Sequence, residues 1–148
     1  MKPINEMKLM IPSDSANEGF ARATVAAFVS QLDPQVDELV DIRTAVSEAV
    51  TNCIVHAYPE GKGTIVLTAR LYADGRVVLK VADKGCGIED VEQAMEPLFT
   101  TGGEERSGLG FSVMESFCDR LRVRSKKGKG TTVTLEKYVG AGRRAERP

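Results

Sequence analysis

The feature that most constrains this sequence is a long stretch, residues 34–58, whose apolar side chains recur three and four positions apart. This spacing predicts a helix with one apolar stripe, which must be buried against a second layer of structure. Asp33 and Pro34 predict its start, as an N-cap followed by a proline at the first helical position. Pro59 and Gly61 predict its end. The stripe consists of Val36, Leu39, Val40, Val46, Val50, Cys53, Ile54 and Ala57.

The residues before this helix predict an edge strand and a second helix. Apolar and other residues alternate over 7–11, which is typical of a strand. Ser15 and Glu18 form an S-x-x-E capping box, and the apolar residues that follow as far as Leu32 have helical spacing.

The residues after the long helix predict two hairpins and one more helix. A turn at Ala73-Asp74-Gly75 and another at residues 126–130 each separate two alternating runs. The expected strands are 65–71, 77–81, 121–125 and 131–138, and the expected helix is 109–119. This order predicts an α+β sandwich, with helices on one face of a mainly antiparallel sheet.

Length and composition limit the class of protein. The 148 residues fit one domain, for which we expect bounds of 1–138 and a disordered tail of 139–148. A formal net charge of −1 argues against bulk binding to nucleic acid or an anionic membrane. The three cysteines have no zinc or disulfide spacing, and no apolar run is long enough for a signal peptide or membrane span. We therefore expect a cytoplasmic protein.

Glu48 and Asn52 are the first candidate site residues. Four positions apart, they lie on one helical face beside the apolar stripe. An asparagine oxygen is a suitable ligand for Mg²⁺, and a glutamate one turn earlier can accept a proton from a hydroxyl. Taken alone, the pair is more often an ordinary solvated helix face.

A second candidate is the D-x-G-x-G sequence Asp83-Lys84-Gly85-Cys86-Gly87, at the end of a predicted strand. Its glycines allow a ligand to approach the backbone, and the carboxylate can accept a hydrogen bond from an exocyclic amine such as that of adenine. In isolation the motif predicts no more than a turn.

Two further glycine motifs follow. Arg106-Ser107-Gly108-Leu109-Gly110 precedes the third helix, where free backbone amides and an arginine form an anion site, although a lone G-x-G more often marks a tight helix entry. Gly130-Thr131-Thr132 opens the last strand and is a weaker signal, because threonine is common in strands.

Taken together, these motifs resemble the N, G1, G2 and G3 boxes of the Bergerat, or GHKL, family of ATP-binding domains. The similarity is closer still over residues 5–138, where SEAVTNCIVHAY, EPLFTT and ERSGLGFSVME resemble the serine-kinase anti-sigma factors of sporulation.

The resemblance implies a role for each motif. Glu48 is the implied catalytic base, and Asn52 the implied Mg²⁺ ligand. The implied contacts of ATP or ADP are Asn52, Asp83, Gly85, Gly87, Thr100, Thr101, Arg106, Ser107, Gly108, Leu109, Gly110 and Thr131, with an ATP lid over residues 97–107.

The same resemblance implies partners. Arg22 matches the family's contact for two proteins: a sporulation sigma factor of the sigma F type, and an anti-anti-sigma factor that is phosphorylated on a serine. It also implies a homodimer. Read without the resemblance, Arg22 is only an exposed helical arginine.

Some features depart from this pattern or leave other functions open. Gly102-Gly103 replaces a stiffer lid segment, and the arginine-containing tail is additional. His56 is the only residue that could serve as the phosphoacceptor of a histidine kinase. The alternatives are the catalytic fragment of a sensor histidine kinase, a general-stress anti-sigma kinase of the same family, and a nucleotide-gated binding module without catalysis.

Overall fold

A computed structural model describes residues 1–59, 61–88, 90–91, 95 and 110–140 of the chain. The elements in chain order are β1 (Asn5–Pro12), α1 (Ala16–Val29), a 3-10 turn (Ser30–Leu32), α2 (Val36–Asn52), a π-helical turn (Cys53–Ala57), β2 (Thr64–Leu71), β3 (Arg76–Asp83), α4 (Phe111–Ser116), β4 (Arg120–Lys126) and β5 (Gly130–Tyr138). The predicted hairpins and all three predicted helices are therefore present, the third being shorter than expected.

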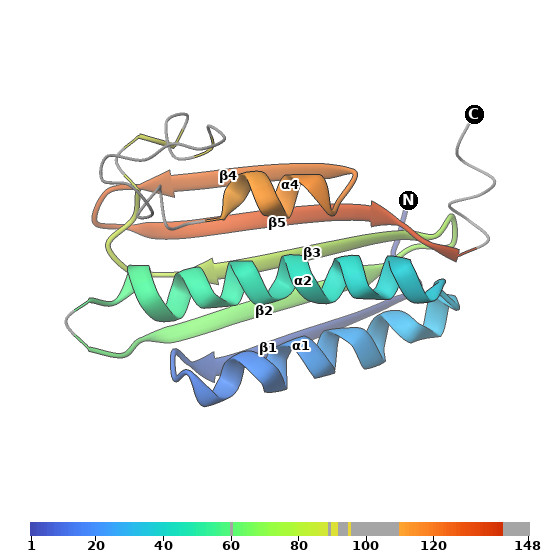
Figure 1. Cartoon of the computed structure of the whole chain (residues 1–148), viewed down its shortest axis with the longest axis horizontal. Coiled ribbons are helices and arrows are strands. Elements are labelled where there is room, and N and C mark those ends of the chain that lie inside the picture. The colour runs from blue at the N-terminus through green and yellow to red at the C-terminus, as the bar shows by residue number, and fades with distance from the viewer. Residues whose placement is uncertain (60, 89, 92–94, 96–109, 141–148) are drawn as a thin grey trace.

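The strands form one antiparallel sheet in the order β1-β2-β3-β5-β4. Within the described residues, the helices α1, α2 and α4 lie on the same face of this sheet, α1 over β1, α2 over its centre and α4 over β5 and β4 (Figure 1). The predicted α+β sandwich is confirmed.

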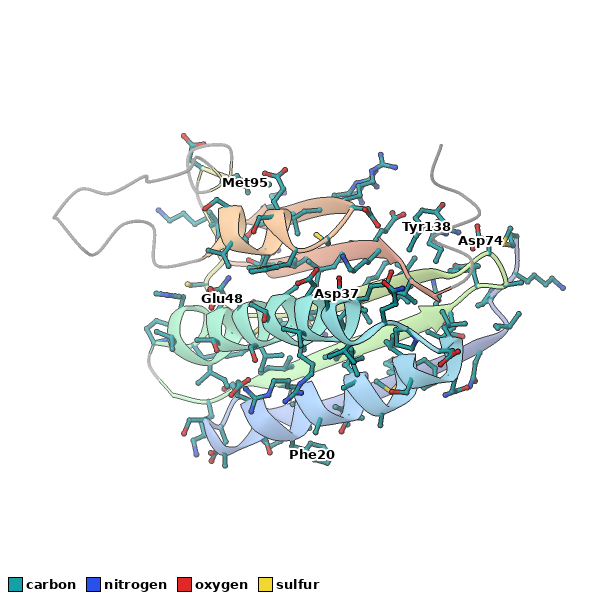
Figure 2. The ribbon with its side chains drawn as sticks, turned by 45° about the vertical axis from the view of Figure 1, so that its right-hand side comes forward. Phe20, Asp37, Glu48, Asp74, Met95 and Tyr138 are labelled. Atoms are coloured by element: carbon teal, nitrogen blue, oxygen red, sulfur yellow. The ribbon has the colours of Figure 1, made fainter. Side chains whose placement is uncertain are left out.

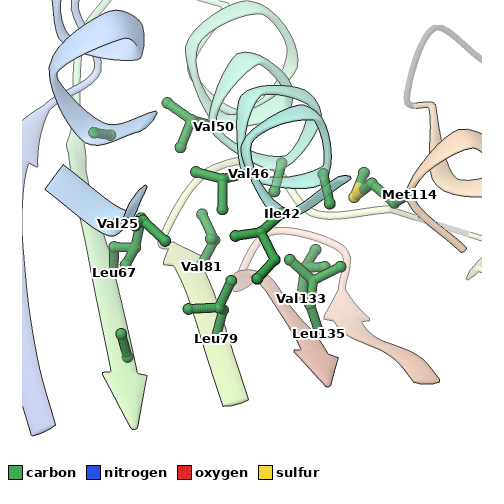
Figure 3. Packing of buried hydrophobic residues seen from close by; sticks show 14 of the residues in the cluster. Val25, Ile42, Val46, Val50, Leu67, Leu79, Val81, Met114, Val133 and Leu135 are labelled. Atoms are coloured by element: carbon green, nitrogen blue, oxygen red, sulfur yellow. The ribbon is translucent and has the colours of Figure 1, made fainter. Parts of the chain in front are cut away.

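The core fills the space between α2 and the sheet. Alternate residues of each strand point toward the helices, because successive strand side chains face opposite ways. Leu67, Val81 and Val133 stand opposite one another in register on three adjacent strands, and all are buried. Val46 and Val50 of α2 pack down onto this layer (Figure 3). Burial of each such side chain contributes roughly 1.5–3 kcal/mol, which fixes the height and rotation of α2 on the sheet.

Helix α1 begins where predicted, with Ser15 as its N-cap residue, but the predicted capping box does not form. The Ser15 side chain makes no capping bond, and Asp14 Oδ1 accepts the Ala16 N–H instead (2.9 Å). Glu18 does not close the capping box, because its carboxylate accepts the Ser47 hydroxyl and pairs with Arg22.

The start of α2 also differs from the prediction. Asp33 adopts a left-handed conformation (φ 53°) and is not the N-cap. Gln35 takes that role, in a capping box with Glu38. The capping box at Gln35 is preferred over a cap at Asp33 because the Glu38 carboxylate accepts the Gln35 N–H directly (2.8 Å).

The fold extends past the predicted domain boundary at residue 138. Val139 is fully buried, and its N–H donates to the Gly75 carbonyl oxygen (2.9 Å). The Gly140 N–H donates to Glu38 Oε1 (3.0 Å). The last strand is thereby tied to the first turn of α2, and residues 141–148 lie outside the described residues.

Candidate nucleotide site

The C-terminal end of α2 widens into a π-helical turn, and this turn docks the loop after β3. Two of its carbonyl oxygens accept bonds from Cys86: Ala57 O from the backbone N–H (2.8 Å) and His56 O from the thiol (3.2 Å). A Cβ at Gly85 would overlap the carbonyl oxygen of Ala57. The D-x-G-x-G motif therefore needs its first glycine in order to contact the helix end.

Asp83, the acidic residue of that motif, is held at both carboxylate oxygens. Its Oδ1 accepts the backbone N–H groups of Gly85 (2.9 Å) and Thr131 (3.2 Å). Its Oδ2 accepts the thiol of Cys53 (3.4 Å). The neighbouring loop and two elements distant in sequence, the π-helical turn and β5, thus fix one half-buried carboxylate at the end of β3.

A pocket opens beside Asp83, between the end of α2 and the sheet. Its lining is Ala49, Asn52, Cys53, His56, Ala57, Asp83, Cys86, Gly87, Ile88, Phe111, Thr131 and Val133. The structure therefore brings together Asn52, Asp83, Gly87 and Thr131 from three separate motifs. Mostly apolar walls with one carboxylate suit a flat heterocycle that carries an amino group.

Two more glycines keep the sheet side of the pocket compact. Gly87 has φ of 76° and Gly130 has φ of 110°, which disfavour other residues. A Cβ at Gly87 would overlap the Lys126 carbonyl oxygen, and a Cβ at Gly130 would overlap that of Asp83. The β4–β5 turn and the loop after β3 therefore pack backbone against backbone.

Glu48 lies one turn before Asn52, beside the start of α4 (Figure 2). Gly110 caps α4 with φ of 65°, and a Cβ there would overlap Glu48 Oε1. Burial raises the pKa of Glu48, because it disfavours the charged form. A carboxylate with a raised pKa is a better proton acceptor in general base catalysis.

A groove of about 370 Å³ runs from Glu48 to Arg22, lined by Arg22, Val40, Arg43, Thr44, Ser47 and Glu48. Arg22 is half-buried, pairs with Glu18 (3.4 Å) and donates to the Ser47 hydroxyl (3.5 Å). Arg22 and Glu48, which are 26 positions apart in sequence, therefore share one surface.

Three polar residues of the site had no sequence signal of their own. Cys53 donates to Asp83, as described above. The Tyr58 hydroxyl accepts the Lys84 N–H (2.8 Å) and donates to the Thr64 carbonyl oxygen (2.8 Å). The Ser125 hydroxyl accepts the Ile88 N–H (2.7 Å) and shares a hydrogen bond with the Thr131 hydroxyl (2.7 Å). Each of these side chains bonds to a residue outside its own motif, and such contacts cannot be predicted from one motif alone.

Other predicted site residues lie outside the described residues: Thr100, Thr101, Arg106, Ser107, Gly108 and Leu109. Their roles, and those of Glu48, Asn52, Asp83, Gly85, Gly87, Gly110, Thr131 and Arg22, remain predictions. Among the described residues, no helix is long and apolar enough to cross a membrane.

Comparison with known proteins agrees with this fold. Residues 11–137 match the histidine kinase-like ATPase domain family. The RsbU and RsbW domains of Rv1364c from Mycobacterium tuberculosis superpose with a TM-score of 0.68 at 24% identity, covering 93% of this chain and 33% of that one. A histidine kinase domain from Erythrobacter litoralis gives a TM-score of 0.57 at 17% identity, covering 88% and 66%. The family match over most of the chain defines the class of this protein, a histidine kinase-like ATPase domain.

Sequence relatives narrow the class. An anti-sigma F factor of Caldanaerobacter subterraneus subsp. tengcongensis is 55% identical, covering 94% of this chain and 97% of that protein. One from Geobacillus kaustophilus is 54% identical, covering 91% and 93%. The chain belongs to the anti-sigma F factor family, within the histidine kinase-like ATPase domains.

Proposed function

We propose that this protein is an anti-sigma factor and a protein serine kinase. It binds a sigma factor of the sigma F type, and with Mg-ATP it phosphorylates a serine of an anti-anti-sigma factor. The observation that carries the proposal is the position of Glu48, between the groove that contains Arg22 and the pocket that contains Asp83. A protein docked on the groove is within reach of a nucleotide in the pocket.

The pocket residues fit ATP. The Asp83 carboxylate, held by the Gly85 and Thr131 N–H groups, would accept a hydrogen bond from the adenine amino group, and the glycines at 85, 87 and 130 keep the surrounding backbone close. The Asn52 side-chain oxygen is a hard ligand of the kind that Mg²⁺ takes from a protein alongside nucleotide phosphates and water. When bound, Mg²⁺ neutralises phosphate charge.

In this proposal Glu48 is the general base. It accepts the proton of the substrate serine as the serine oxygen bonds to the γ-phosphorus. The bond from that phosphorus to the bridging oxygen breaks, and ADP leaves. Phosphoryl transfer depends mainly on position and charge, so one well-placed carboxylate is sufficient protein chemistry.

Arg22 is the proposed contact for both protein partners. An arginine that is partly held by Glu18 and Ser47 loses little conformational freedom on binding an acidic surface. One groove for two partners makes their binding exclusive. Unphosphorylated antagonist then displaces the sigma factor, and the phosphorylated form dissociates. We propose that the working unit is a homodimer.

The test is a phosphorylation assay with radiolabelled ATP and candidate anti-anti-sigma proteins, followed by phosphoamino-acid analysis. Phosphoserine on the added protein is the expected product. Glu48→Gln should lower the rate by roughly 10²-fold or more while nucleotide still binds. Phosphohistidine on the chain itself, or an unchanged Glu48→Gln rate, would contradict the proposal.

The partner assignment needs a separate measurement. Arg22→Glu should weaken sigma-factor binding by more than about tenfold and leave ATP affinity unchanged. The matched control is Arg43→Glu, which reverses an exposed charge elsewhere on the same groove. If both reversals weaken sigma binding equally, the effect belongs to the charge of the groove as a whole and Arg22 has no special role.

A further inference from the structure

The helix-free face of the sheet carries a row of cations along β4. Arg120, Arg122, Arg124 and Lys126 alternate with Leu121 and Val123, which pack against the core. The four cations therefore point away from the helices, and all four are exposed. We name them the basic edge. The whole chain has a formal charge of −1, so this concentration of positive charge is local.

Among the described residues, none of the four cations forms an ion pair. The acidic residue opposite Arg120 on β5 is Glu136, and it pairs with Arg76 (3.5 Å). Arg122 and Arg124 stand opposite Thr134 and Thr132, which are neutral. Like charges two positions apart are about 6.6–6.8 Å from each other, within a Debye length, so they repel one another.

The basic edge lies at a border of the sheet. β4 is the last strand in the sheet order, opposite β1 (Figure 1). Charged residues do protect edge strands from pairing, and lysine is the usual choice. Here three of the four are arginine, whose planar guanidinium binds carboxylates through two parallel hydrogen bonds. This composition favours binding over simple protection.

We propose that β4 is a docking edge for an extended acidic segment of another protein, added to the sheet as a further strand. The backbone of β4 would supply main-chain hydrogen bonds, as in other cases of strand addition. Side chains on the outer face of the added strand would meet the cations, so these positions are acidic. Side chains on the opposite face of the added strand would pack beside Leu121 and Val123, so we expect apolar residues at those positions.

The surroundings favour a polypeptide over a nucleic acid. Single-stranded nucleic acids are bound by basic grooves in which aromatic side chains stack on the bases. The strand segments around the basic edge, residues 78–82, 120–126 and 130–136, contain no aromatic residue. The period of two along β4 instead matches the side-chain period of a partner strand.

This surface is separate from the groove that contains Arg22, which lies on the helical face. Binding at β4 therefore stands independently of the proposed kinase and anti-sigma activities. Variants of the basic edge should phosphorylate an anti-anti-sigma factor at the parent rate. The two proposals can fail separately.

The direct test uses two fluorescent peptides of the length of β4 and of identical composition. In one peptide glutamate and valine alternate, and in the other they are grouped in blocks. The alternating peptide should bind the parent protein at least about tenfold more tightly. The variant Arg122→Glu with Arg124→Glu should lose at least about tenfold of that affinity, because attraction becomes repulsion.

Matched controls separate charge from structure. Arg122→Lys with Arg124→Lys keeps the charge but not the paired hydrogen bonds of the guanidinium, so it should lose some affinity and clearly less than the charge reversal does. Lys2→Glu with Lys62→Glu reverses two exposed charges elsewhere and should leave peptide binding unchanged. Nucleotide binding by each variant checks that it is folded. If the variant with the β4 charges reversed does not fold, hydrogen exchange of the parent protein still tests the proposal. Strand addition must slow amide hydrogen exchange within residues 120–126 when the peptide is bound.

Three outcomes would overturn the proposal. Equal affinity for the two peptides would show attraction of charge without strand pairing. Unchanged amide hydrogen exchange in β4 at a saturating peptide concentration would also show that the peptide binds without strand pairing. The third outcome is that a single-stranded oligonucleotide, or vesicles containing phosphatidylserine, bind more tightly than the alternating peptide. If the reversal of Arg122 and Arg124 also abolishes that binding, the basic edge belongs to a different class of partner.

Discussion

The two ends of α2 use the same hydrogen-bonding pattern for different purposes. Near the first turn, Glu38 Oε1 accepts two backbone N–H groups, from Gln35 and Gly140. Beyond the last turn of this helix, which is about 25 Å long, Asp83 Oδ1 accepts two as well, from Gly85 and Thr131. Each carboxylate joins segments that are distant in sequence.

The difference between the two carboxylates is exposure. Glu38 is 3% exposed, and its bonds close the fold around the last strand. Asp83 is half-buried and lines the pocket, where it can take a further donor from a ligand. A buried carboxylate that binds only its own chain contributes to stability. One that is equally well held but open to a pocket is positioned for recognition.

The largest effect is expected from Asp83→Asn. The amide keeps an oxygen for the Gly85 and Thr131 N–H groups, but the negative charge is lost and an NH₂ group now faces the ligand amine. We expect ATP affinity to fall by about 100-fold or more, measured by titration calorimetry, with thermal stability little changed. A stable variant that binds ATP like the parent would remove Asp83 from recognition.

At the other end of α2, we expect a substitution to lower stability and to leave ATP affinity unchanged. Glu38→Ala leaves two backbone N–H groups without an acceptor in a buried site, so the free energy of unfolding should fall by about 2–4 kcal/mol. Denaturant unfolding measures this, and ATP affinity of the folded variant should be unchanged. Glu38→Gln keeps an oxygen acceptor and should lose less than half as much. A stable Glu38→Ala with weakened ATP binding would contradict the comparison.

The two ends also differ in how far sequence predicted them. At the pocket end, the sequence singled out Asp83 with its glycines as a compact motif and Asn52 by its helical spacing from Glu48, and Asn52, Asp83 and Gly87 line one pocket in the structure. At the other end the predicted cap was wrong. Asp33 was expected to cap α2, but Gln35 caps it in a capping box with Glu38. Glu38 also accepts the N–H of Gly140, which is over 100 positions away.

The same rule explains the rest of the fold. Local periodicity predicted every described strand, since alternation is a property of neighbouring residues. It did not predict the π-helical turn at Cys53–Ala57, which is tied to the loop after β3 through Cys86. Nor did it predict that Ser47 would take Glu18 away from its capping box. The sequence did not predict contacts between two elements when the contacting residues belonged to no recognised motif.

Cys53 tests how much the support of Asp83 matters. The thiol is buried, and burial raises its pKa, so it remains protonated and donates to Asp83 Oδ2. Cys53→Ala should weaken ATP binding by about threefold, since a thiol is a weak donor. Cys118→Ala removes a different thiol, which is half-buried and donates to the Met114 carbonyl oxygen, and this change should not affect ATP affinity. Equal effects in both variants would indicate a general packing loss.

The smallest effect concerns Glu48, between the two ends. Because the fold raises the pKa of Glu48, its protonated form favours the folded state. That contribution is complete below the unfolded-state pKa and is lost as the pH rises through the folded-state pKa. At neutral pH the ionised side chain therefore costs some stability, because it is partly buried.

Glu48→Gln should accordingly raise the melting temperature by about 2 °C at neutral pH, because a neutral amide avoids the desolvation of a charge. The gain should shrink as the pH is lowered, since the parent glutamate then becomes protonated too. Thermal unfolding of both proteins across this range measures it, with Glu38→Gln as the control that loses stability. A Glu48→Gln variant less stable than the parent, or a gain independent of pH, would show that the carboxylate is held by favourable contacts, as Glu38 is.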